Sequence, residues 1–171
     1  MIMTGLGAAS LQSAYADTAG GDAGTINFTG KVLASTCHLD STSLQVPMGT
    51  ISADAYKTAG TVGNSVPVPI VLKGCDPSLQ DVSVELDGNK DTVNNQLLQL
   101  TQDADAAKGF GIELLDPNST PVAIGNTSNP ITLQAGDNTL AFKARYVSTV
   151  DSKDLEPGQA NAQASFLLKY R

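Results

Sequence analysis

The chain contains, after a polar and glycine-rich leader, the strictly alternating stretch GTINFTGKV. Its residues Gly24, Ile26, Phe28, Gly30 and Val32 fall on one side, and the residues between them are polar. Successive side chains of an extended chain point to opposite faces, so the pattern predicts a half-buried β-strand. Two of the five inward positions are glycines, which add little to a hydrophobic core. The pattern leaves open which surface this strand packs against.

The C-terminal stretch ANAQASFLLKY has the same one-faced pattern. Leu167 is the one apolar residue on its polar face. This pattern predicts a second half-buried strand, so both ends of the chain carry an apolar face that can meet another surface. The second apolar face consists of Ala160, Ala162, Ala164, Phe166, Leu168 and Tyr170.

The residues between these two stretches form short alternating or apolar runs separated by turn sequences such as Asp87-Gly88 and Asn129-Pro130. Many short strands at this spacing predict an antiparallel β-sandwich. Residues 51–60 and 103–109 are each expected to form about one helical turn, too short for an independent helix. The expected strands are 43–49, 65–75, 81–88, 96–100, 109–116, 121–125, 129–136 and 138–148.

Length and charge narrow the function classes. A chain of 171 residues with 41% hydrophobic content suits one domain with a sizeable core. The net charge is -7, the sequence pI is about 4.4, and the basic residues form no cluster. We therefore expect no nucleic acid and no anionic membrane surface as a partner.

The first sixteen residues, MIMTGLGAASLQSAYA, carry no charge and end in a small-x-small pattern at Ala14 and Ala16. This is typical of the end of a secretory signal peptide, which places the start of the mature chain at Asp17. The alternative is an ordinary N-terminus. No other run approaches the roughly 18 apolar residues of a membrane span.

The two cysteines, Cys37 and Cys75, lie 38 residues apart and belong to no C-x-x-C motif. In an exported chain the expected state is one disulfide between them. Closing a loop of this size stabilises a fold by about 3 to 4 kcal/mol in the chain-entropy model. Two reduced core cysteines in a cytosolic protein are the alternative, which depends on the signal peptide being absent.

The sequence gives little support for an enzymatic function. His38 is the single histidine, so a metal site with several histidines cannot be built, and a Ser/His/Asp relay would have to use His38 itself. The carboxylates of residues 103–109 and 151–156 alternate with lysines and match no calcium loop. We expect no catalytic residue, no metal and no cofactor, and a solvent-facing or hydrogen-bonded structural role for His38.

An ordered set of motifs resembles structural subunits of chaperone-usher pili, most closely the major pilin of type 1 fimbriae. Members of this family have a penultimate aromatic residue and a glycine 14 residues from the C-terminus, positions that hold Tyr170 and Gly158 here. The resemblance extends from about Gly24 to Arg171. Its segments are GTINFTGKV, LASTCHLD, VPIVLKGCDP, GFGIELLDPNSTPVAIG, ITLQAGDNTLAFKARYVST and PGQANAQASFLLKYR.

The resemblance implies an incomplete immunoglobulin-like sandwich, completed by a donor strand from another subunit. It divides the chain into a signal peptide remnant (1–16), a donor-strand extension (17–32) and a pilin domain (33–171). The donor face is Gly24, Ile26, Phe28, Gly30 and Val32, where Gly30 occupies the position at which the family keeps a glycine. The acceptor groove includes the apolar face from Ala160 to Tyr170.

The resemblance also implies partners: neighbouring copies of the same pilin, a periplasmic chaperone and an outer-membrane usher, on a route through the periplasm to a fimbrium at the cell surface. Burying Ile26, Phe28 and Val32 contributes about 1.5 to 3 kcal/mol each, a sum comparable with the total stability of a small domain. Three alternatives stay open: a minor adaptor, a tip adhesive subunit, and a self-complemented monomeric binding module that pairs GTINFTGKV within its own chain.

Overall fold

The computed structural model describes residues 25–30 and 36–171. The chain divides between Val32 and Leu33 into two units. The expected signal peptide (1–16) lies outside the described residues, as do Gly24 and Val32 of the expected donor face. Every strand assigned in the described residues belongs to the second unit.

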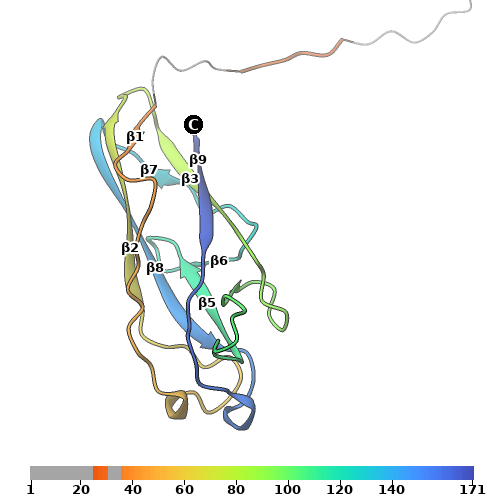
Figure 1. The fold of residues 1–171 in the computed structure, drawn as a ribbon. Coiled ribbons are helices and arrows are strands. Elements are labelled where there is room, and N and C mark those ends of the chain that lie inside the picture. The colour runs from red at the N-terminus through yellow and green to blue at the C-terminus, as the bar shows by residue number, and fades with distance from the viewer. Residues whose placement is uncertain (1–24, 31–35) are drawn as a thin grey trace, which may run out of the picture. The chain divides into compact units, whose positions relative to one another are not determined.

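The second unit is built from two antiparallel β-sheets, and its long strands β2 and β8 run side by side (Figure 1). The larger sheet contains, in spatial order, β1 (His38–Leu39), β2 (Val66–Cys75), β8 (Gly136–Ser148), β5 (Phe110–Leu115) and β4 (Leu98–Gln99), with β6 (Pro121–Val122) paired to β5. The smaller sheet contains β7 (Ile131–Thr132), β3 (Asp81–Gly88) and β9 (Ala164–Tyr170). The predicted all-β antiparallel architecture is confirmed for the described residues.

The hydrophobic core follows from the two-residue period of these strands. In β8, the buried residues Leu140, Phe142, Ala144 and Tyr146 alternate with more exposed neighbours. The buried residues of β2 and β3 join them in one apolar cluster. The core therefore depends on alternate positions of a few long strands, which is why the sequence pattern predicts it well.

Two expected strands have no assigned strand in the structure. Residues 43–49 keep the predicted alternation, since Leu44, Val46 and Met48 are half-buried and their neighbours are exposed. Residues 25–30 are likewise assigned to no strand. An apolar face alone does not make a strand, because a strand also needs a partner for its backbone groups.

The helical expectations are partly wrong. The turn predicted within 51–60 is present as the 3-10 turn η1 (Ala53–Ala55), and a second turn, η2 (Ser152–Asp154), was not expected. Residues 103–109 contain one hydrogen-bonded turn, from the Asp103 carbonyl to the Ala106 amide, but no helix, and Ala107 and Lys108 instead donate backbone hydrogen bonds to the segment 156–159. No helix in the described part of the chain is long and apolar enough to cross a membrane.

A disulfide joins Cys37 to Cys75, which confirms the predicted pairing. It links the first residues of the second unit to the end of β2. His38 follows Cys37 in β1 and is exposed, in agreement with a solvent-facing role. Free cysteines are absent from the described residues.

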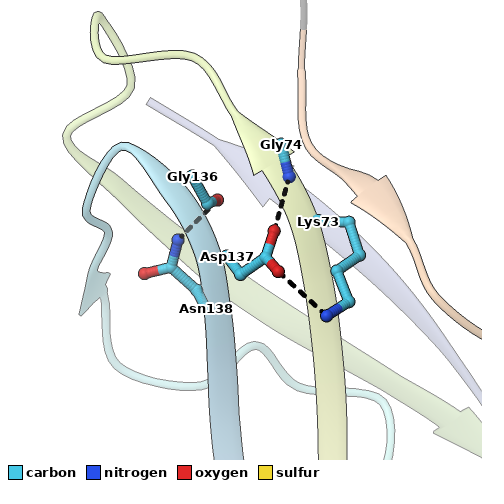
Figure 2. A network of polar contacts seen from close by, with 5 residues as sticks. All are labelled: Lys73, Gly74, Gly136, Asp137 and Asn138. Carbon is cyan, nitrogen blue, oxygen red and sulfur yellow. Dashed lines mark hydrogen bonds and ion pairs between the residues drawn. The ribbon is translucent and has the colours of Figure 1, made fainter.

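A polar network holds the irregular end of β2 beside β8 (Figure 2). The register of the two strands shifts between Leu72 and Cys75, and Gly74 has a φ of 59°, in the left-handed region that favours glycine. The carboxylate of Asp137 accepts hydrogen bonds from the Lys73 ammonium (2.9 Å) and the Gly74 amide (3.1 Å). These donors hold the pKa of Asp137 below its ordinary value.

Candidate functional site at the edge of β9

The apolar face of β9 and the residues before it is only half-buried. Phe166, Leu168 and Tyr170 pack against the core, as do Ala160 and Ala162, but none of these five is fully covered. Leu167, on the opposite face, is 60% exposed. This strand therefore contacts its own core and still leaves apolar surface open to another partner.

Ala164 departs from the rest of this face, because it is exposed and does not pack against the core. It lies opposite Gly88 in the β3–β9 ladder. These two small residues take part in lining a surface hollow of about 250 Å³. The hollow is also lined by Asp87, Asn89, Gln163 and Ser165, so its walls are mostly polar.

One edge of β9 is paired and the other is free. β9 is the last strand of the smaller sheet, and in the part of the chain that the structure describes no strand pairs with its outer edge. Arg171 and Asp81 exchange two backbone hydrogen bonds. Bonded and non-bonded pairs alternate along an antiparallel ladder, so the odd-numbered residues of β9 bond to β3.

The even-numbered residues of β9 consequently direct their N–H and C=O groups toward the free edge. Their side chains are the ones that face the core. We call the row of backbone groups of the even-numbered residues from Ala162 to Tyr170 the open edge. Apolar side chains and unpaired backbone groups at the same positions are the combination that an added strand uses: the backbone supplies affinity and the alternate side chains supply specificity.

The row is interrupted at Ala160. The hydroxyl of Tyr146, which projects from β8 in the other sheet, donates a hydrogen bond of 2.8 Å to the Ala160 carbonyl. Tyr146 is buried, and burial raises the pKa of its hydroxyl, so the donor stays protonated at neutral pH. Tyr56 lies close by and packs edge-to-face on Phe110.

Gly158, the glycine of the C-terminal motif, lies against the backbone of the neighbouring segment. A Cβ atom added there lies 2.4 Å from the carbonyl oxygen of Asp105 and 2.6 Å from the backbone nitrogen of Ala107. Gln159 is hydrogen-bonded to the same segment. A side chain at position 158 is therefore excluded sterically within this chain, because the segment that precedes β9 packs closely on residues 105–107.

The N-terminal segment shows the opposite situation. Ile26 is 77% exposed and Phe28 is 90% exposed. A Cβ atom added at Gly30 meets no other atom within 4 Å, and Gly30 does not have a positive φ. Among the residues that the structure describes, neither space nor backbone conformation explains a glycine at this position.

Sequence reasoning missed some residues around this site. Tyr146 lies in the expected strand 138–148 but was not singled out, because alternation shows which way a side chain points and not which backbone group its hydroxyl reaches. Leu39 and Ile51 also pack half-buried against the core, as do Leu44 and Met48. The alternation of residues 43–49 is the signal that could have identified the latter pair.

Comparison with known proteins gives consistent matches over nearly the whole chain. A family model described as fimbrial protein matches residues 26–171. A type-1 fimbrial protein subunit of Serratia marcescens is 36% identical over 176 residues, covering 96% of each chain. The type-1 fimbrial protein A chain of Salmonella typhi is 36% identical over 154 residues, covering 86% of this chain and 82% of the relative.

Solved structures agree with these matches. A type I fimbria protein and antigen of Burkholderia pseudomallei has 34% identity and a TM-score of 0.62, covering 80% of this chain and 90% of that chain. A subunit from a chaperone-usher pilus structure concerned with rod uncoiling has 21% identity and a TM-score of 0.66, covering 91% and 100%. The second likeness concerns the fold, and it confirms the expected immunoglobulin-like sandwich.

Proposed function

Because this chain belongs to the fimbrial protein family, we propose that it polymerises by donor-strand exchange, with residues 24–32 of one copy pairing with the open edge of the next. The chain is a subunit of a chaperone-usher pilus, a structural protein and not an enzyme. Its assembled form is a fimbrium at the cell surface, built from neighbouring subunits.

The observation that carries this proposal is the match between two incomplete surfaces. The open edge presents unpaired backbone groups above a half-buried apolar face. The N-terminal segment presents the alternating residues Ile26 and Phe28 with their side chains largely exposed. Each surface lacks what the other provides, and strand addition satisfies the backbone and the apolar face of both together.

Gly30 supports the same assignment. Nothing in the described residues accounts for its lack of a side chain, and a partner that approaches closely at this position would. In the inserted strand, Gly30 lies over a shallow part of the acceptor face, and the larger Ile26 and Phe28 fill deeper positions. The complete donor face is Gly24, Ile26, Phe28, Gly30 and Val32, and the acceptor face is Ala160, Ala162, Ala164, Phe166, Leu168 and Tyr170.

The free edge also supports a role for assembly factors. An exposed strand edge above apolar surface is an aggregation hazard before assembly. A periplasmic chaperone that lends a strand removes this hazard, and an outer-membrane usher then exchanges the lent strand for the extension of another subunit. The chain passes through the periplasm on this route, with residues 1–16 as signal peptide, 17–32 as donor extension and 33–171 as pilin domain.

A pair of neighbouring substitutions tests the donor face. Phe28→Asp places a carboxylate on the inserted face, and Thr29→Asp places the same charge on the outward face. We expect cells that make the Phe28→Asp chain to export the subunit but to form no fibres in electron micrographs, because an unpaired charge is costly to bury. Thr29→Asp is expected to leave fibres nearly normal. Fibres of normal length and number from Phe28→Asp would refute the donor assignment.

We place the subunit in the fibre shaft. Immunogold labelling of isolated fibres measures this directly, because a shaft subunit is labelled along the whole length. Label confined to one end would identify a tip or adaptor subunit instead. A chain that forms no fibres and stays a stable monomer would identify a self-complemented binding module.

A further inference from the structure

We propose that the Tyr146 hydroxyl fixes the register of the incoming strand, because it occupies the Ala160 carbonyl and ends the open edge at Ala162. This inference rests on the proposed donor-strand exchange and names the residue that positions the donor. Tyr146 acts through Ala160 and is a positioning residue, since its ring lies in the core and not at the surface of the edge.

The first step of the argument is the direction of the Ala160 carbonyl. Gln159 and Asn161, odd-numbered like the residues of β9 that bond to β3, use their backbone groups in hydrogen bonds with Asp105, Ala107 and Thr101. Because successive residues of an extended chain alternate, Ala160 directs its carbonyl to the other side, in line with the open edge. Ala160 is therefore the next position that a strand growing along this edge would reach.

The second step is that this position is already satisfied. The Tyr146 hydroxyl donates to the Ala160 carbonyl at 2.8 Å. The Tyr146 backbone is fixed as well, since it pairs with Ile112 in β5 and its carbonyl accepts a hydrogen bond of 2.8 Å from the Gly63 amide. An amide of an incoming strand would have to share the Ala160 carbonyl with a buried hydroxyl that is already bonded to it, so a bond there contributes less than a bond to a carbonyl that has no donor.

The third step is a match of lengths. From Ala162 to the penultimate Tyr170 the open edge has nine residues, and the donor stretch from Gly24 to Val32 also has nine. Antiparallel pairing within these limits places Val32 opposite Ala162 and Gly24 opposite Tyr170. A slip of two residues keeps the apolar face inward and is the nearest competing register, whereas a slip of one turns that face outward.

Cysteine pairs on the outward faces distinguish the two registers. In the proposed register Asn27 lies opposite Leu167, and in the slipped register it lies opposite Ser165. Since the even-numbered residues form the hydrogen-bonded pairs, these odd-numbered pairs are the closer ones, at a Cα spacing of about 4.5 Å that suits a disulfide. All three positions are exposed, and the native cysteines are already bonded to each other.

The experiment uses the full chain with Asn27→Cys plus Leu167→Cys, or with Asn27→Cys plus Ser165→Cys, oxidised during assembly. Intermolecular disulfide yields are read on non-reducing gels and confirmed by mass spectrometry. We expect the 27/167 pair to dominate. Tyr146→Phe should lower the ratio of 27/167 to 27/165 at least about fivefold, because the carbonyl of the half-buried Ala160, left without its donor, favours the slip that satisfies it.

Tyr56→Phe is the matched control, because it removes a neighbouring buried hydroxyl that does not bond to Ala160, and the ratio should not change. An unchanged ratio in Tyr146→Phe, or dominance of the 27/165 pair in the otherwise native chain, would overturn this inference but leave strand exchange intact. If neither pair forms in any background, strand exchange itself fails, and this inference with it.

A second measurement needs no substitution at Tyr146. Amide hydrogen exchange in assembled native chains should show protection at Val32, which faces Ala162, and none at Ala34, which faces the occupied Ala160. Equal protection of both amides would show that the edge continues past Tyr146 and would contradict the inference.

Discussion

The N-terminal segment and β9 have the same sequence pattern but different surroundings. Phe28 is 90% exposed, whereas Phe166 is half-buried and packs against the core. The backbone of β9 is paired along one edge with β3, and residues 25–30 belong to no strand. The comparison teaches that alternation predicts an apolar face but not the molecule that covers it.

Two glycines repeat the contrast. Gly158 is required by its own chain, because an added Cβ lies 2.4 Å from the Asp105 carbonyl oxygen. Gly30 has no such neighbour among the described residues. One glycine is thus explained within its own chain, whereas the described residues leave the other unexplained, as the proposed donor role requires.

The largest expected effect is in β9, where adjacent residues have opposite environments. Phe166→Asp should destabilise the subunit by about 4 kcal/mol, because it removes packed apolar surface and forces a carboxylate toward the core. Leu167→Asp, on the exposed face, should change stability by less than about 1 kcal/mol. Urea denaturation followed by far-UV circular dichroism measures both. Equal losses would mean that the two faces of β9 are not distinguished as described.

Removing the disulfide is expected to cause the second-largest loss of stability. Replacing Cys37 and Cys75 together by serine should lower the free energy of unfolding by about 3 to 4 kcal/mol, because the unfolded chain is no longer held in a 38-residue loop. Chemical denaturation of the double variant measures the loss. A matching loss after reduction of the native chain serves as the control, and a change below about 1 kcal/mol would contradict a stabilising role.

The glycine pair provides a smaller effect. Gly158→Ala should cost about 1 to 3 kcal/mol, because the added methyl group meets backbone atoms that cannot move aside easily. Gly30→Ala should leave the unassembled subunit unchanged within about 0.5 kcal/mol but reduce fibre yield. Thermal unfolding of monomers separated by gel filtration tests the first part. A stable Gly158→Ala subunit would remove the steric explanation for this motif.

The smallest expected effect is at Phe28 in the unassembled chain. Phe28→Ala removes an exposed ring, so the stability of the monomer should change by less than about 0.5 kcal/mol. The same substitution should accelerate the dissociation of assembled fibres in denaturant. A marked destabilisation of the monomer would show that Phe28 packs within its own chain, as in a self-complemented module.

The sequence predicts the parts of this fold that depend on local periodicity. β2, β3, β8 and β9 coincide with expected alternating runs, and a pair of cysteines in an exported chain leaves one disulfide to form. Residues 43–49 show where this reasoning ends. Their alternation is present in the structure, but no strand forms, because strand formation depends on a backbone partner that the pattern does not specify.

The sequence predicts the two apolar faces of the site, but it does not predict where the open edge of β9 begins and ends. Ala164 is exposed and lies opposite Gly88, a pairing that only the β3–β9 register reveals. The Tyr146 contact depends on how far one sheet lies from the other, and no spacing in the sequence encodes that distance. Long-range geometry therefore supplies the boundaries that periodicity leaves open.

The most direct test uses the full chain with Phe28→Asp, which cannot donate its own strand, and a synthetic peptide of residues 24–32. We predict that the native peptide binds with one-to-one stoichiometry and raises the melting temperature by about 10 °C or more, as expected for burying three apolar side chains. The same peptide with Phe28→Asp should have no effect. A melting temperature that the native peptide leaves unchanged, in a chain that is already fully stable, would contradict the account.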